Sequence, residues 1–183
     1  MKYSSKDYEL IDNTALQVRL DYGYLEKTLD VFSLAKDLNM ILIKYSSLTK
    51  EQLNQIKGYE ETKDGFTIMR TVNGELKFYT CYNDNVGAYR IRFTIAHEKK
   101  HVVFLEKEPT DKQEDLANHF ARYILAPTCL VMQYFGKLPE DIMFDFDISY
   151  EAATNALSAA ESRILCNCDK LSSVEKEFVG KVK

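Results

Sequence analysis

The strongest constraint on the fold lies between residues 66 and 82, where two runs of strand-forming residues flank the dipeptide Asn73-Gly74. A type I′ turn needs positive φ angles at both of its central positions, and Asn followed by Gly tolerates them well. The runs 66–72 and 75–82 are each long enough for a strand. The sequence therefore predicts a β-hairpin, and the fold must contain a sheet built on it.

Helical spacing is found ahead of the hairpin. Apolar residues recur every three or four positions through residues 22–38, which predicts an amphipathic helix that ends at Asn39. Residues 40–45 then form a short apolar run suited to a buried strand, whereas residues 1–20 show no clean period. One helix and one strand are thus expected before residue 46.

Two capping boxes mark the starts of further helices. The pair Thr49 and Gln52 opens a short helix that is expected to stop near Gly58. The pair Thr110 and Gln113 opens another, which the next proline must end. The other predicted helices cover residues 88–105 and 149–165, with a short piece around residues 139–143 between them. This layout is α+β.

Composition indicates a folded, soluble protein of the cytoplasm. The chain has 183 residues, enough for one globular core, and 45% of them are apolar. No apolar run approaches the roughly 18 residues of a membrane span, and the N-terminus lacks the order of a secretory signal. The four cysteines show neither CxxC spacing nor the density of a disulfide scaffold. A net charge of −4 disfavours a protein whose main task is to bind nucleic acid phosphates.

The residues best suited to chemistry form an HExxH motif at positions 97–101, inside the predicted helix 88–105. Four residues advance a helix by about 400°, so His97 and His101 point the same way one turn apart, and two imidazoles can hold one metal ion. Glu98 lies on the adjoining flank, where its carboxylate can take a proton from the attacking water. The motif predicts a zinc peptidase site with Glu98 as general base, and histidines that merely fill a core are the alternative.

A zinc peptidase needs a third protein ligand, and the next predicted helix offers Glu114, Asp115 and His119. On a helical wheel Glu114 lies at the edge of the apolar arc, with Asn118 one turn further on. Asp115 and His119 face the polar side. Helical phase therefore favours Glu114, and Asn118 is a candidate for orienting a ligand or the substrate. Manganese or iron could occupy the same nitrogen-rich site.

Three blocks of the sequence resemble the ImmA/IrrE family of metallopeptidases. Residues 92–101 read RFTIAHEKKH, residues 114–121 read EDLANHFA, and residues 124–127 read ILAP. Members of the family typically show RFTxAHExxH, ExxANxFA and LLxP in this order. The hairpin ahead of the motif also fits, as do Asp147-Ile148-Ser149 and the Ala-rich segment that follows.

The resemblance implies a zincin-like α+β fold, in which the helix that carries HExxH packs against a small mixed sheet. It implies Zn2+ held by His97, His101 and Glu114, with Glu98 as the catalytic base. It further implies an endopeptidase that cleaves a helix-turn-helix transcriptional repressor, often of a phage or mobile element, and so relieves repression.

We expect two parts in the chain. Residues 1–130 would form the zinc metallopeptidase domain, and residues 131–183 a C-terminal helical segment packed on it, helix-turn-helix-like and with a polar tail. No internal repeat or low-complexity linker separates them. The sequence does not indicate an oligomeric state.

The motif departs from the family at one position, since members usually have Gly before the second histidine and this chain has Lys100. Lys100 points about 300° from His97 on the wheel, so we expect it along the wall of the cleft, where it would attract or hinder an acidic substrate. Lys99 points at about 200°, beside Arg92, and is expected to be solvated.

Two other functions remain open. A catalytically weak or inactive member of the family would bind a repressor without cleaving it, and metal content measured beside a turnover assay would separate the two cases. Direct DNA binding through the tail over residues 141–165 is least favoured, because that segment carries five acidic residues and Arg163 as its one basic residue.

Overall fold

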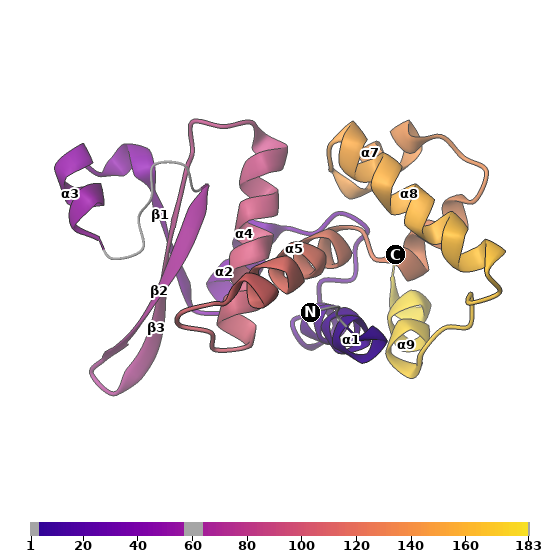
Figure 1. Ribbon diagram of the computed structural model, residues 1–183, viewed down its shortest axis with the longest axis horizontal. Helices are drawn as coiled ribbons and strands as arrows, with labels where there is room; N and C mark the ends of the chain where they lie inside the picture. Colours follow the sequence, from indigo (N-terminus) through magenta and orange to yellow (C-terminus); the bar gives the residue numbers. More distant parts are fainter. Residues whose placement is uncertain (1–3, 57–63, 183) are drawn as a thin grey trace. The chain divides into compact units, whose positions relative to one another are not determined.

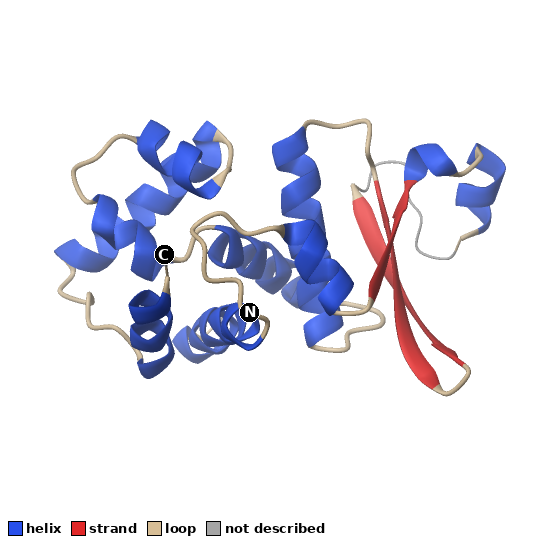
Figure 2. Ribbon diagram, turned by 180° about the vertical axis from the view of Figure 1, so that it is seen from behind, coloured by secondary structure: helices blue, strands red, loops and turns tan. Residues whose placement is uncertain are grey.

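The computed structural model describes residues 4–56 and 64–182. These residues form helices and one three-stranded mixed sheet, so the predicted α+β fold is confirmed (Figure 1, Figure 2). The chain folds into two compact units. The sheet unit is Asp30–Ala121, and the helical unit consists of Met1–Leu29 with Arg122–Lys183.

The sheet unit holds the strands β1 (Met40–Lys44), β2 (Gly65–Val72) and β3 (Glu75–Tyr82). Their order is β1-β3-β2, with β1 parallel and β2 antiparallel to the central β3. Within the described ranges β2 pairs with β3 alone, so β2 lies at an edge of the sheet. The predicted strand over residues 40–45 is confirmed.

The turn between β2 and β3 has the predicted geometry. Asn73 and Gly74 have φ angles of 53° and 83°, and both are positive, as a type I′ turn requires. Val72 pairs with Glu75 across the turn. The predicted hairpin is therefore confirmed.

The two faces of the hairpin contact different helices, because successive side chains of a strand point to opposite sides. α3 (Lys50–Gln55), opened by the predicted capping box, covers one face, and α4 (Ala88–Val103) packs on β2 and β3 from the other (Figure 1). The predicted end of α3 at Gly58 lies outside the described residues. A small core on the α3 side consists of Tyr45, Leu53, Phe66 and Cys81.

Gly65 allows α4 to approach the edge strand closely. A Cβ atom at this position would lie 2.6 Å from Cγ2 of Thr94 on α4 and 3.1 Å from the carbonyl oxygen of Cys81. A larger residue fits there only if the Thr94 side chain or the adjoining backbone shifts. The helix that carries HExxH is thus held directly against β2.

The predicted helix over residues 22–38 is only partly correct, because α2 covers Val31–Asp37 alone. The carboxylate of Asp30 caps this helix by accepting hydrogen bonds from two backbone N–H groups of the first turn, at 3.0 Å each. That cap fixes the start of α2 although the apolar spacing extends further back. Asn39 adopts a φ of 56°, which confirms the predicted stop.

The prediction that Lys99 is solvated is wrong. Its side chain is 0% exposed, and its Nζ donates to the backbone carbonyls of Val31 at 2.7 Å and Ile95 at 3.4 Å. The flank of α4 that the helical wheel assigned to solvent faces α2 instead, and α2 and α4 are in contact. Burial holds the pKa of Lys99 well below its ordinary value.

The helical unit begins with α1 (Ser5–Asp21), which the sequence pattern did not reveal. Its periodicity is obscured because the buried side includes Arg19, which is 0% exposed. The Arg19 guanidinium donates to the carbonyl oxygens of Tyr24 and Ile124, at 3.1 Å each, and to that of Glu26. These bonds tie the segment after α1 to the helix.

The other helices of the chain are α5 (Asp111–Leu125), α6 (Thr128–Val131), α7 (Pro139–Phe146), α8 (Tyr150–Leu165) and α9 (Ser173–Lys181), with short 3-10 turns at Tyr45–Ser47 and Met132–Tyr134. The start of α5 agrees with the predicted capping box of Thr110 and Gln113, and α8, capped by Ser149, agrees with the helix predicted over residues 149–165. α9 lies where a polar tail was expected, and its Glu175 accepts hydrogen bonds from Arg163 and Tyr123. A domain boundary at residue 130 stays a prediction.

Gly65→Ala is expected to lower the free energy of unfolding by about 1–3 kcal/mol, because the added methyl group overlaps Thr94 in a packed interface. Adding Thr94→Ser, which removes the obstructing Cγ2 atom, should recover most of the loss. Urea unfolding followed by circular dichroism measures both effects, with Thr94→Ser alone as the control. An unchanged midpoint in Gly65→Ala would show that the approach is looser than described.

Candidate active site

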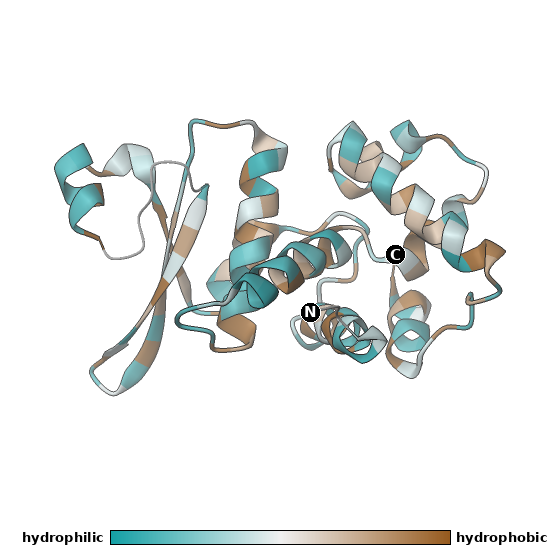
Figure 3. Ribbon diagram, in the orientation of Figure 1, coloured by the Kyte–Doolittle hydropathy of each residue, from teal (hydrophilic) through white to brown (hydrophobic). Residues whose placement is uncertain are grey.

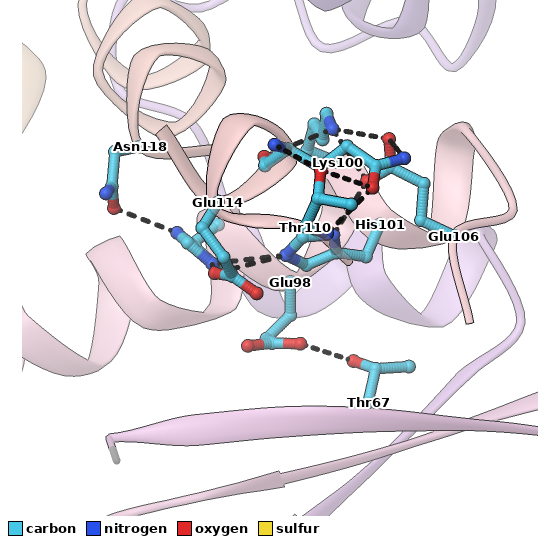
Figure 4. Close-up of polar contacts among 10 residues, drawn as sticks. Thr67, Glu98, Lys100, His101, Glu106, Thr110, Glu114 and Asn118 are labelled. Atoms are coloured by element: carbon cyan, nitrogen blue, oxygen red, sulfur yellow. Dashed lines mark hydrogen bonds and ion pairs between the residues drawn. The ribbon is translucent and has the colours of Figure 1, made fainter. Parts of the chain in front are cut away.

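α4 brings the two histidines of the motif together. His97 and His101 lie one turn apart, their ring centroids are 5.1 Å from each other, and their Nε2 atoms are 3.2 Å apart (Figure 4). Glu98 follows His97 and lies on the adjoining flank of α4, as the helical phase predicted, and its carboxylate contacts Thr67 of β2 (Figure 4). All three side chains belong to the sheet unit.

α5 contributes the acidic member of the cluster. Its ribbon contains both hydrophilic and hydrophobic stretches (Figure 3), its apolar residues are buried, and Glu114 lies in its first turn. The Glu114 Oε2 atom is 3.0 Å from Nε2 of His97 and 3.7 Å from Nε2 of His101. One ligand atom from each of the three residues lies within 4.8 Å of the others. Neither Asp115 nor His119 belongs to this group.

The outer nitrogen of each imidazole is engaged by a different residue. His97 Nδ1 lies 3.0 Å from Oδ1 of Asn118, and His101 Nδ1 lies 2.8 Å from Oε2 of Glu106. Since these oxygens accept, each Nδ1 donates its proton, and the Nε2 atom of each ring, which faces Glu114, is the nitrogen available to a metal ion. Two imidazole nitrogens and a carboxylate oxygen that converge in this way are a suitable donor set for zinc.

The electrostatics of the cluster favour a cation. Burial lowers the pKa of His101, but the nearby carboxylates of Glu114, Glu98 and Glu106 outweigh this effect and raise it. The imidazoles of His101 and His97 in turn hold the pKa of Glu114 well below its ordinary value. A metal ion bound between these groups would be stabilised by the same carboxylate charges.

The Glu98 carboxylate is positioned from the sheet. It is 5% exposed, and its Oε2 accepts a hydrogen bond of 2.8 Å from Thr67 Oγ1 on β2, whose hydroxyl is also 2.8 Å from that of Thr80 (Figure 4). Burial raises the pKa of Glu98, against the opposing effect of the two histidines and Thr67. A carboxylate whose pKa moves toward neutrality is better suited to accept and return a proton.

The expectation that Lys100 lines the cleft is wrong. The side chain is 1% exposed, and its Nζ lies 2.6 Å from each carboxylate oxygen of Glu106 and 3.2 Å from the carbonyl of Gln113. The ammonium group thus donates its hydrogen bonds to groups inside the protein. It neither attracts nor hinders a substrate by direct contact.

Sequence reasoning missed two residues that contact the cluster, Thr67 and Glu106. The register that pairs Thr67 with Thr80 could be read from the hairpin, but not the helix that lies over that face. Glu106 follows the end of α4, and no spacing rule connects it to His101. By contrast, Asn118 contacts His97 as the helical phase suggested.

Comparison with known proteins bears on the same residues. No helix in residues 4–56 or 64–182 combines the length and apolarity that crossing a membrane requires. A search of curated proteins finds no match to the chain. Residues 80–158 match the family model described as Peptidase_M78, IrrE N-terminal-like domain, a stretch that includes α4, α5 and the cluster between them. The family match over residues 80–158 confirms the predicted ImmA/IrrE resemblance.

Proposed function

We propose that this protein is a zinc-dependent endopeptidase in which His97, His101 and Glu114 hold the metal and Glu98 is the general base. The observation that carries the proposal is the convergence of three ligand atoms within 4.8 Å, beside a buried carboxylate. Three protein ligands leave a fourth position free, as a catalytic zinc site needs. The peptidase-type family supports the same reaction class.

The residues of the chain have separate tasks in this mechanism. Bound zinc supplies Lewis acidity, which activates water and polarises a carbonyl group. Glu98 takes the proton of the attacking water on its carboxylate and delivers it to the leaving amine. Thr67 holds one oxygen of Glu98 and so fixes the direction of the other. Asn118 and Glu106 keep the Nε2 lone pairs of the histidines turned inward.

The substrate we propose is a protein with an extended segment. β2 lies at the edge of the sheet in the described part of the chain, and its Thr67 contacts the proposed base. A segment added along this edge as a further strand would run past Glu98 and be bound through its backbone. On the family resemblance, we infer that a cytoplasmic helix-turn-helix repressor is cleaved and its repression relieved. The buried position of Lys100 gives no support to an inactive repressor-binding module.

Glu98→Gln should retain zinc and fold but lose at least about 100-fold in peptide hydrolysis, because an amide cannot accept the proton of water. Metal analysis of the purified variant, which also distinguishes zinc from manganese or iron, accompanies a cleavage assay against a helix-turn-helix repressor encoded beside the gene. Activity within about tenfold of the parent would exclude Glu98 as the base.

Glu114→Ala should lower zinc affinity by at least about 100-fold and abolish activity, since it removes one of three ligands. His119→Ala, on the same helix, is the matched control and should alter zinc affinity by less than about threefold. Competition with a chromophoric chelator measures both affinities. If His119→Ala caused the larger loss, the assignment of the third ligand would be wrong.

A substrate segment should be cleaved only when it is extended. Holding the same residues in a covalently stapled helix is expected to slow cleavage by at least about tenfold, because a helix cannot pair with a strand edge. Mass spectrometry of the products over time gives the rates for the linear and the stapled peptide. Equal rates would contradict strand addition at β2.

A further inference from the structure

The chain turns back toward the HExxH motif at the end of α4, and the residue that makes this turn is not glycine. Glu106 donates its backbone N–H to the carbonyl of His101 at 2.9 Å, and Leu105 donates to that of Val102 at 3.2 Å. These two bonds form the Schellman pattern that closes many helices, in which the residue with positive φ is usually Gly. Here that residue is Leu105, with a φ of 54°. A non-glycine residue in this region is strained, and it is maintained where the surroundings require it.

Because of this turn, both the backbone N–H and the carboxylate of Glu106 contact His101. Its N–H bonds the backbone of His101, and its carboxylate bonds the imidazole Nδ1 of the same residue at 2.8 Å. A histidine gripped at both its backbone and its ring has little freedom to rotate.

Every accepting direction of the Glu106 carboxylate is used. Oε1 accepts from Lys100 Nζ at 2.6 Å and from Gln113 Nε2 at 2.9 Å, while Oε2 accepts from Lys100 Nζ at 2.6 Å and from His101. The Glu106 side chain is only 11% exposed. A buried carboxylate tolerates such a place only when a cation pairs with it, and Lys100 is that cation.

The same contacts reach the helix that carries Glu114. Lys100 Nζ also donates to the carbonyl oxygen of Gln113 at 3.2 Å, and Gln113 is both the capping-box residue of α5 and the neighbour of Glu114. Lys100 and Glu106 therefore join the end of α4 to the start of α5.

We propose that Glu106 and Lys100 are a pair of positioning residues for the metal site, an inference that rests on the proposed function. Glu106 holds His101 with its Nε2 atom toward Glu114, and Lys100 neutralises Glu106 and fixes the first turn of α5. Neither residue touches substrate.

The test measures zinc affinity by chelator competition and cobalt(II) absorption of the intact protein loaded with that metal alone. Glu106→Ala should weaken zinc binding about 10- to 100-fold and shift the visible cobalt(II) bands, because His101 is no longer held. Glu106→Gln keeps an acceptor for Nδ1 and should lose clearly less. Glu108→Ala and Lys107→Met, exposed neighbours in the same loop, should leave affinity and spectrum unchanged.

Lys100→Met leaves the Glu106 carboxylate buried without its cation, so it should lower both the unfolding midpoint and zinc affinity. The double variant Lys100→Met with Glu106→Gln removes both charges, and should recover the midpoint while zinc affinity remains below that of the parent. This keeps the test decisive if Lys100→Met alone does not fold.

The outcomes separate this inference from the proposed function. A parent protein that binds no zinc would overturn both. A parent that binds zinc, with Glu106→Ala folded and within about threefold of it in affinity and unchanged in its cobalt(II) spectrum, would overturn the positioning pair and leave the peptidase proposal standing.

Discussion

Desolvation is the constraint on which the sheet unit depends, because α4 carries five consecutive polar residues, 97–101, among its buried neighbours. A polar or charged group removed from water costs free energy unless a partner compensates it. The partners come from every side of the helix: the start of α2 for Lys99, β2 for Glu98, and α5 with the loop before it for the other three. The buried polar residues of the motif therefore require hydrogen-bond partners from the neighbouring elements, and these partners in turn hold the side chains of the motif in place.

As a result, the position of the Glu98 carboxylate depends on the position of the edge strand β2. Gly65 brings β2 against α4, and two positions further along the same strand Thr67 holds the carboxylate of Glu98. Under the proposed mechanism, a substrate segment that pairs with β2 would lie beside the same strand that holds the carboxylate of Glu98.

The elements that the sequence predicted well are those whose causes lie within a few residues. Asn73-Gly74 determines its own turn, Thr110 and Gln113 satisfy each other, and helical phase alone brings Glu114 to the border of the buried face. A helical wheel gives angles relative to His97 but not the element that occupies each angle, which is why Lys99 was misplaced. Glu106 depends on a left-handed Leu105 and on a lysine from the preceding helix, and neither is visible in local spacing.

The composition of the two units has a consequence for the order in which the chain can fold during synthesis. The sheet unit is one continuous stretch, Asp30–Ala121, so all of its contacts are available before the last third of the protein is made. The helical unit joins the N-terminal helix to residues that come much later, since the guanidinium of Arg19 lies over the ring of Phe178, 4.9 Å from its centroid. Contacts between residues so far apart in the sequence cannot form until both residues have been synthesised, so the helical unit folds late. The cluster of His97, His101 and Glu114 can therefore assemble on a nascent chain before the C-terminal residues that contact α1 have been synthesised.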